Sequence, residues 1–209
     1  MSLAKALWEA HTHLARAALE HPFVRGLADG TVPRPHFQRY IAQDAFFLDA
    51  FARAYALALA RSPDQDGLQA FFVLLAGALE ELALHDGYAA RWGAPLTDVT
   101  PDRATCAYTD FLLATAALGG VGQTCAAMVP CMRLYAFLGQ ALALDGLHGE
   151  HAYGEWIRTY AAPGFEELAA RLEGLLDRYA TDTPAVRATY HRAMVLELEF
   201  FTASAAGPT

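Results

Sequence analysis

Apolar residues recur at helical spacing along most of this 209-residue chain. In the first segment Leu3, Leu7, Ala10 and Leu14 fall on one face of a helix, since residues three and four positions apart lie above one another. Proline and glycine separate the segments, because they start or end helices more readily than they continue them. The pattern predicts a short element over residues 23–28 and helices over residues 3–20, 35–61, 62–92, 103–118, 122–144, 148–160, 165–179 and 183–203.

The pattern carries no strand signals. No segment alternates polar and apolar residues over a run of β-branched residues, and no Asn-Gly pair marks a hairpin. The connections between the predicted helices have ordinary lengths for a bundle, and no repeat or interdomain linker interrupts them. We therefore expect an all-α fold in which residues 1–209 form a single domain, a helical bundle of about eight helices.

Composition narrows the range of partners and compartments. Hydrophobic residues make up 55% of the chain, and its formal net charge is −8 with the basic residues scattered, whereas phosphate-backbone binding needs clustered Lys and Arg. The most apolar block, residues 71–79, is too short to cross a bilayer, and the N-terminal residues lack the apolar core of a signal peptide. Three cysteines without paired-ligand spacing favour reduced thiols. We expect a soluble cytoplasmic protein without nucleic-acid or membrane partners.

One cysteine lies at an unusual place in a predicted helix. Pro130 removes a backbone donor, leaves the carbonyl of Ala126 without its helical partner and is expected to bend the helix axis. Cys131 follows at that point, and Tyr135 shares its face four residues later. A thiol and a phenol side by side could line a pocket. A small buried core residue is the alternative interpretation of Cys131.

Two acidic residues interrupt apolar faces. Asp44 lies among apolar neighbours on the helix over 35–61, where a buried carboxylate needs a partner. It could form an ion pair with Arg53 or Arg133, cap a helix, or accept hydrogen bonds from a ligand's amino group or ring nitrogen. In the last helix Glu197 shares a face with Phe200 whereas Glu199 points elsewhere, so Glu197 is the better candidate for the interior.

Further polar groups lie on other predicted helices. Tyr108 and Tyr160 are either core residues or parts of a site, because a buried phenol needs a hydrogen-bond partner. Helical spacing also brings together two pairs of potential metal ligands, Glu81 with His85 and His148 with His151. Such pairs are common on exposed helix faces, and the sequence predicts no metal site from them.

Several short motifs resemble the TenA (thiaminase II) family, in its cysteine-containing branch. They occur in the family's order over almost the whole chain, and the last is similar to its E-x-x-F-W ending. Two positions depart from the family pattern: Phe47 replaces a common Tyr, which leaves the preferred leaving group open, and Phe201 replaces the usual Trp. The matching segments are residues 21–24, 26–30, 37–40, 43–44, 47–48, 51–53, Tyr108 with 111–112, 130–131 with Tyr135, 156–157 with Tyr160, and Glu197 with 200–201.

The resemblance implies a heme-oxygenase-like helical bundle, usually a homotetramer, that hydrolyses aminopyrimidines related to the pyrimidine half of thiamin without a cofactor. By matching position, it implies Cys131 as the nucleophile, Glu197 as the acid/base group and Asp44 as the acceptor for the ring nitrogen and exocyclic amine. It assigns the pocket wall to aromatic residues. These are Phe47, Tyr108, Tyr135, Tyr160 and Phe200.

The chemistry is consistent with these residues. An aminopyrimidine becomes a good electrophile once its ring is protonated, and a desolvated Glu197 with a raised pKa could supply the proton. Arg133 is turned away from Cys131, so the group that activates the thiol must come from another helix, as Glu197 or a tyrosine network. A metal-dependent oxygenase on the same bundle and a non-catalytic pyrimidine-binding regulator are the alternatives, and a DNA-binding regulator fits the acidic chain least.

Overall fold

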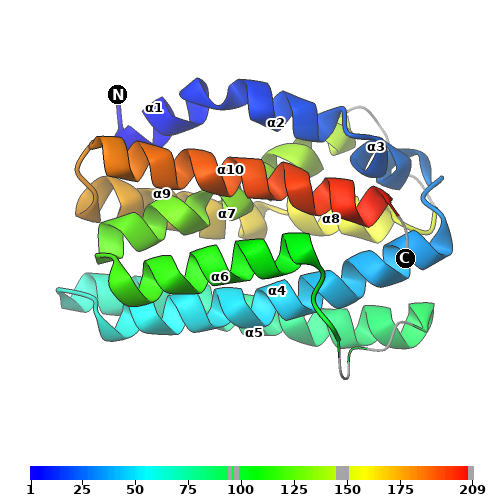
Figure 1. Cartoon of the computed structure of the whole chain (residues 1–209), viewed down its shortest axis with the longest axis horizontal. Coiled ribbons are helices and arrows are strands. Elements are labelled where there is room, and N and C mark those ends of the chain that lie inside the picture. Colours follow the sequence, from blue (N-terminus) through cyan, green and yellow to red (C-terminus); the bar gives the residue numbers. More distant parts are fainter. Residues whose placement is uncertain (94–95, 97–98, 145–150, 207–209) are drawn as a thin grey trace.

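The computed structural model describes residues 1–93, 96, 99–144 and 151–206, and these form ten helices and no strand (Figure 1). The predicted all-α fold is confirmed, with more helices than the expected eight or so. The helices are α1 (Leu3–Ala10), α2 (Thr12–Leu19), α3 (Pro22–Asp29), α4 (Arg34–Ala60), α5 (Gln65–Trp92), α6 (Arg103–Leu118), α7 (Val121–Leu144), α8 (Gly154–Ala161), α9 (Pro163–Tyr179) and α10 (Pro184–Ala205).

The higher count has two local causes. The helix predicted over residues 3–20 is divided at His11, whose backbone leaves the helical region (φ −113°, ψ 12°) and whose ring Nδ1 lies 2.7 Å from the carbonyl oxygen of Leu7. The short element expected over residues 23–28 is a full helix, α3, with Pro22 in its first turn and Gly30 at φ 72° after its end. The predicted start of the eighth segment, His148, lies outside the described residues.

Helix starts are fixed by short polar side chains. Asp64 accepts a hydrogen bond from the Gly67 backbone N–H at 2.8 Å, so that α5 begins at Gln65 instead of residue 62. Asp102 caps α6 in the same way, and Thr183 caps α10 as the sequence predicts, with 3.2 Å to the N–H of Val186. These caps set the register of the long helices that carry the buried polar groups.

Helix α7 lies at the centre of the bundle. It contacts α6, α8, α9 and α10, while α4 runs along α5 and α6 on the other side (Figure 1). Every residue from Thr124 to Met132 is buried, and the helix continues through Pro130. By length and composition α7 could cross a membrane, but it is mostly buried, as expected of a core helix in a globular bundle.

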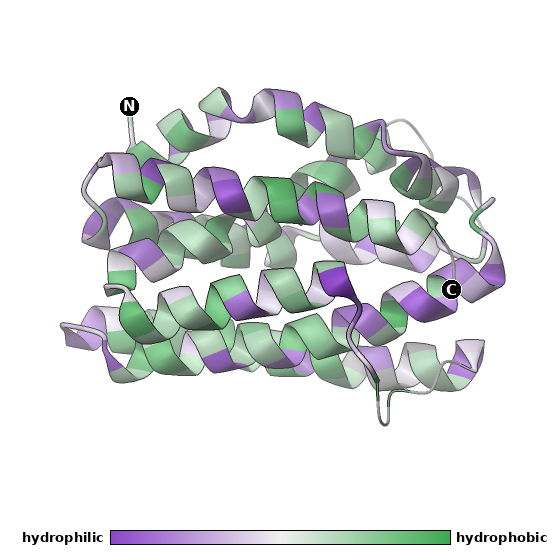
Figure 2. Ribbon diagram, in the orientation of Figure 1, coloured by the Kyte–Doolittle hydropathy of each residue, from purple (hydrophilic) through white to green (hydrophobic). Residues whose placement is uncertain are grey.

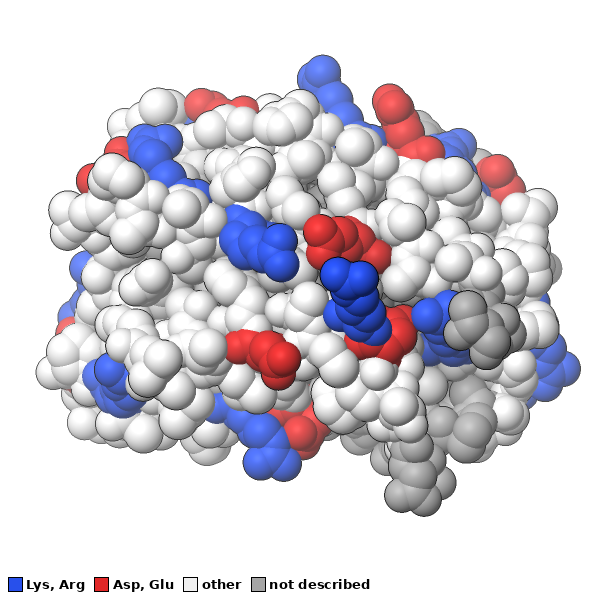
Figure 3. Space-filling view, viewed as in Figure 1, with Lys and Arg blue, Asp and Glu red and all other residues white. Residues whose placement is uncertain are grey.

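Packing against α7 also places α8. A Cβ atom on Gly139 would lie 2.4 Å from the carbonyl carbon of Tyr160, so only glycine permits this close approach of the two helices. The visible helices carry both polar and apolar residues, as amphipathic elements do (Figure 2). On the face shown in Figure 3, basic and acidic side chains are interspersed over a largely uncharged surface.

Candidate active site

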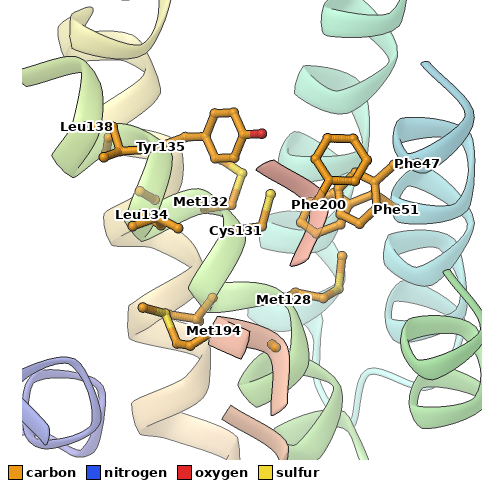
Figure 4. Close-up of a cluster of buried hydrophobic side chains, with 14 of the residues drawn as sticks. Phe47, Phe51, Met128, Cys131, Met132, Leu134, Tyr135, Leu138, Met194 and Phe200 are labelled. Carbon is orange, nitrogen blue, oxygen red and sulfur yellow. The ribbon is translucent and has the colours of Figure 1, made fainter. Parts of the chain in front are cut away.

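Cys131 opens onto an enclosed pocket in the bundle core. The pocket is bounded by side chains from α4, α5, α7, α8 and α9. Figure 4 shows the thiol of Cys131 beside Met132 and Tyr135, on the side of α7 that faces Phe47 and Phe51 of α4. Cys131 keeps 9% exposure, whereas Cys125 of the same helix is fully enclosed in the core. The thiol therefore borders a space instead of a packed seam.

The structure brings the predicted site residues to this pocket in two groups. Five of the eight line it directly, and the other three lie immediately behind its wall. Glu197 lies next to the Cys131 thiol, and Tyr108 forms a hydrogen bond with Glu197. Phe200 packs on Phe47 with 6.2 Å between ring centres. The five residues that line the pocket are Asp44, Phe47, Cys131, Tyr135 and Tyr160.

Glu197 enters the core from α10. Its side chain is buried, with 2% exposure, whereas Glu199 is exposed, as the helical register predicts. The Tyr108 hydroxyl of α6 donates to Oε1 of Glu197 at 2.7 Å, and the thiol of Cys131 lies close enough to this carboxyl group to affect its pKa. Burial raises the pKa of Glu197 to about 7, although the hydrogen bond from Tyr108 favours its charged form. A carboxyl group that titrates near neutral pH can both accept and donate a proton.

The Cys131 thiol is protonated in the free protein. Burial raises its pKa well above the ordinary value, and the negative charges of Glu197, Glu81 and Asp44 raise it further. The nearest basic residue in sequence, Arg133, points away and binds Glu166 and Glu173 of α9 at 2.8 and 2.7 Å. The thiol can therefore ionise only by passing its proton to a neighbour, and Glu197 is the carboxyl group with the strongest effect on its pKa.

Asp44 has a partner that the sequence did not reveal. Its Oδ2 lies 2.8 Å from Nε2 of His85 on α5, and both side chains are about 95% buried. The expected ion pairs with Arg53 or Arg133 are wrong, because Arg53 binds Asp49 on the surface at 2.7 Å. Nδ1 of His85 lies 2.9 Å from the Glu81 backbone carbonyl, and these bonds raise the pKa of His85 to about 9 despite its burial. Asp44 and His85 thus form an ion pair that holds the carboxylate in place.

Glu81 is the third carboxylate at the pocket. The Tyr160 hydroxyl donates to its Oε1 at 2.7 Å, so this phenol bonds to Glu81 and not to the thiol. Burial raises the pKa of Glu81 to about 7, and the charge of Asp44 adds to the effect. Among the described residues no group of three potential ligands could hold a metal ion. Of the second pair considered as metal ligands, His148 lies outside the described residues.

Further aromatic side chains pack behind the residues that line the pocket. Trp156 donates to the Tyr40 hydroxyl at 3.0 Å, and that hydroxyl lies 3.3 Å from the hydroxyl of Tyr135. Because Tyr40 accepts from Trp156, it can donate its own proton to Tyr135. The Phe47 ring lies 4.6 Å from Tyr108, centre to centre. The result is a dry, flat-sided space with polar groups at fixed points, which suits a small heteroaromatic ring.

Gln43, the neighbour of Asp44, fixes the loop before α6. Its amide nitrogen donates to the carbonyl of Thr100 at 3.1 Å, and its oxygen accepts from the N–H of Asp102 at 2.9 Å. Asp102 in turn caps α6, the helix that carries Tyr108. Of these adjacent residues, Gln43 thus helps to position the helix of Tyr108, and Asp44 lines the pocket itself.

The fold and the site together define a class, a helical bundle that encloses a protonated thiol and three carboxylates around a small-molecule pocket. Heme oxygenase from Synechocystis has the same fold at a TM-score of 0.62 and 15% identity, covering 97% of this chain and 92% of that one. The chain belongs to the TENA/THI-4/PQQC family, whose model matches residues 8–205. The implied heme-oxygenase-like bundle is therefore confirmed.

Relatives in this family include free-standing and fused proteins. The chain is 36% identical to an aminopyrimidine aminohydrolase from Halalkalibacterium halodurans, over 86% of this chain and 83% of that one. It is 34% identical to the mitochondrial bifunctional TH2 protein of Arabidopsis thaliana over 94% of its own length, but spans only 36% of that protein. A TenA family transcription regulator from Silicibacter superposes with a TM-score of 0.89 at 30% identity, covering 97% and 96% of the two chains.

Proposed function

We propose that this protein is an aminopyrimidine aminohydrolase that converts 4-amino-5-aminomethyl-2-methylpyrimidine, or thiamin itself, to the hydroxymethylpyrimidine. The observation that carries the proposal is the contact between the Cys131 thiol and the Glu197 carboxylate at the wall of a pocket that also presents Asp44. The name of the Halalkalibacterium relative supports the substrate class.

Asp44 binds and orients the substrate. Its anchored carboxylate accepts hydrogen bonds from the exocyclic amine and the protonated ring nitrogen, while His85 balances its charge on the other side. Phe47 and Tyr135 bound the pocket on either side of the space that the ring fills, and Phe200 supports Phe47 from behind. Tyr108 keeps Glu197 in reach of the thiol.

Glu197 moves one proton between sulfur and ring. It takes the proton of the Cys131 thiol and gives it to a ring nitrogen while sulfur bonds to a ring carbon. The ring electrons then expel the leaving group from the methylene carbon, which leaves an exocyclic double bond. Water adds to that carbon and gives a proton back to Glu197, the carbon–sulfur bond breaks with its electrons on sulfur, and the thiol is restored.

The test is removal of the thiol. Cys131→Ala should leave the fold intact and lower turnover of the aminomethylpyrimidine by at least about 10³-fold, because the carbon–sulfur bond of the covalent intermediate cannot form. Cys125→Ala, a thiol of the same helix outside the pocket, is the matched control and should keep its turnover. Product formation followed by chromatography decides the question. Wild-type turnover by Cys131→Ala, or tight binding without turnover by the wild type, would contradict the proposal.

We also propose that residues 1–209 act as one domain in a cytoplasmic homotetramer, without a cofactor. Large apolar side chains exposed on one face of α5 support an interface: Leu68, Phe72 and Leu79, at 38, 64 and 52% exposure, follow helical spacing. Light scattering should give the mass of four chains, and the mass of a single chain would refute the assembly.

A further inference from the structure

Glu81 lies between two cavities. It borders the pocket of Cys131 and Asp44, and it also borders a second, smaller cavity whose wall includes Tyr40, His85 and Trp156. Tyr160 lines both cavities and donates to Oε1 of Glu81. No other hydrogen bond to the Glu81 carboxylate comes from the described residues, so Oε2 is available to a ligand in either cavity.

The carboxylates around Glu81 outnumber the nearby cations, because Asp44 and Glu81 share the charge of one histidine, His85. Asp44 binds His85 at 2.8 Å, and Glu197 lies beside a phenol and a thiol. Of the described residues that line the two cavities, none is a lysine or an arginine, and His85 is the one positively charged group. A buried carboxylate is stable in its charged form only beside a positive group. One histidine thus serves two carboxylates, and a cationic substrate would supply the second positive group.

We propose that Glu81 binds the departing amine of the substrate in its protonated form and so makes the site selective for cationic leaving groups. The inference rests on the proposed function, because that reaction releases an amine from a methylene carbon next to the ring. A primary ammonium group carries three N–H donors, and Oε2 of Glu81 can accept one of them while Tyr160 holds the carboxylate in place. Asp44 would then bind the ring and Glu81 the leaving group.

The proton balance of the step fits this role. The carbon–nitrogen bond breaks with both electrons going to nitrogen, so the ammonium group leaves as neutral ammonia. The water that replaces it gives one proton to Glu197, which restores the thiol, and the proton on the ring nitrogen passes to ammonia, which becomes ammonium. Glu81 faces the nitrogen before and after cleavage, and the second cavity borders Glu81 on its other side.

Binding to a turnover-deficient protein tests the inference directly. In Cys131→Ala we expect 4-amino-5-aminomethyl-2-methylpyrimidine to bind roughly 10- to 100-fold more tightly than its hydroxymethyl counterpart, as for one charged hydrogen bond. Adding Glu81→Gln should bring the two dissociation constants within about 3-fold of each other. Adding Glu80→Gln, an exposed neighbour on the same helix, should leave the preference unchanged. Isothermal titration calorimetry measures all six dissociation constants.

The outcomes separate this inference from the proposed function. If the wild type releases no hydroxymethylpyrimidine, the proposed function fails. If it does, and the double variant with Glu81→Gln keeps the preference for the amine, or Cys131→Ala shows none, the role of Glu81 is refuted. Should Glu81→Gln fail to fold, as judged by circular dichroism, Glu81→Asp keeps the charge but withdraws it by one methylene. An intermediate preference in that variant would support the inference, and an unchanged preference would refute it.

Discussion

Two glutamate–tyrosine pairs lie at the same pocket and differ only in their surroundings. Glu197 of α10 pairs with Tyr108 of α6, and Glu81 of α5 pairs with Tyr160 of α8, each with an O–O distance of 2.7 Å. In both, burial raises the pKa of the carboxyl group from 4.5 to about 7. The hydrogen bond and the pKa of each pair are therefore too similar to show which glutamate transfers a proton and which binds a ligand.

The neighbours of each pair decide what it can do. Glu197 is 2% exposed and contacts the thiol of Cys131, so its proton has only a short path to the reacting atoms. Glu81 borders two cavities beside the Asp44–His85 ion pair, where a ligand can reach it. One pair is suited to moving a proton and the other to binding a cation. A raised pKa therefore marks a glutamate as a candidate functional residue, and the groups and ligands that can reach its carboxylate determine its role.

The largest expected effect is on turnover. Glu197→Gln should lower kcat by roughly 10²- to 10⁴-fold for the aminomethyl substrate and for a methoxymethyl analogue, because the thiol loses its proton acceptor. Glu81→Gln should impair the aminomethyl substrate alone, since methoxide carries no positive charge to bind. Steady-state kinetics with both substrates measures this contrast. Equal losses in Glu81→Gln with both substrates, or near-normal kcat in Glu197→Gln, would remove the distinction between the pairs.

A smaller effect concerns stability. The Glu197 carboxyl titrates near pH 4.5 in the unfolded chain and near 7 in the folded protein, so between these values the folded state binds more protons. A rise in pH across this window therefore lowers the free energy of unfolding. Glutamine does not titrate, so Glu197→Gln should gain stability relative to wild type between pH 5 and pH 8, by roughly 1–3 kcal/mol.

Urea unfolding at the two pH values measures this gain. Glu199→Gln, an exposed glutamate two residues further along α10, is the matched control and should show a difference from wild type that does not change with pH. A pH-independent difference for Glu197→Gln as well would mean that its carboxyl group has an ordinary pKa in the folded protein.

The sequence predicted most of the helices, and it predicted the part of the site formed by Cys131, Tyr135 and Glu197. Cys131 with Tyr135, and Glu197 in preference to Glu199, follow from helical spacing alone, and the structure places all three predicted groups at the pocket. The exceptions in the fold are local: a histidine ring at the Leu7 carbonyl divides the first helix, and no spacing rule would show that.

The sequence could not predict the partners of Glu81 and His85. Glu81 and His85 share a helical face and therefore suggested a metal pair, but each side chain bonds to a residue of a different helix, Tyr160 or Asp44. These partners are 79 and 41 positions away in the chain, so only the packing of α4, α5 and α8 reveals them. The sequence shows that a buried carboxylate needs a partner, but only the tertiary structure shows which residue that partner is.

The smallest expected effect separates the two tyrosines. The hydrogen bond from Tyr108 lowers the pKa of Glu197, and the bond from Tyr160 lowers that of Glu81. Tyr108→Phe and Tyr160→Phe should therefore each raise the pKa of the glutamate that they leave, by up to about one unit. Both glutamates act as carboxylates in the free enzyme, so kcat/KM should rise with pH through about 7 in the wild type.

The substrate decides which tyrosine shifts this profile. With the methoxymethyl analogue only Glu197 must ionise, so Tyr108→Phe should move the rise of kcat/KM to higher pH and Tyr160→Phe should leave it in place. With the aminomethyl substrate both variants should move it, because Glu81 must also carry charge to bind the amine. Profiles from pH 5 to pH 8.5 for two variants and two substrates measure the shifts. If Tyr160→Phe moved the profile equally with both substrates, Glu81 would act in the chemistry common to them, and the division between proton transfer and amine binding would be wrong.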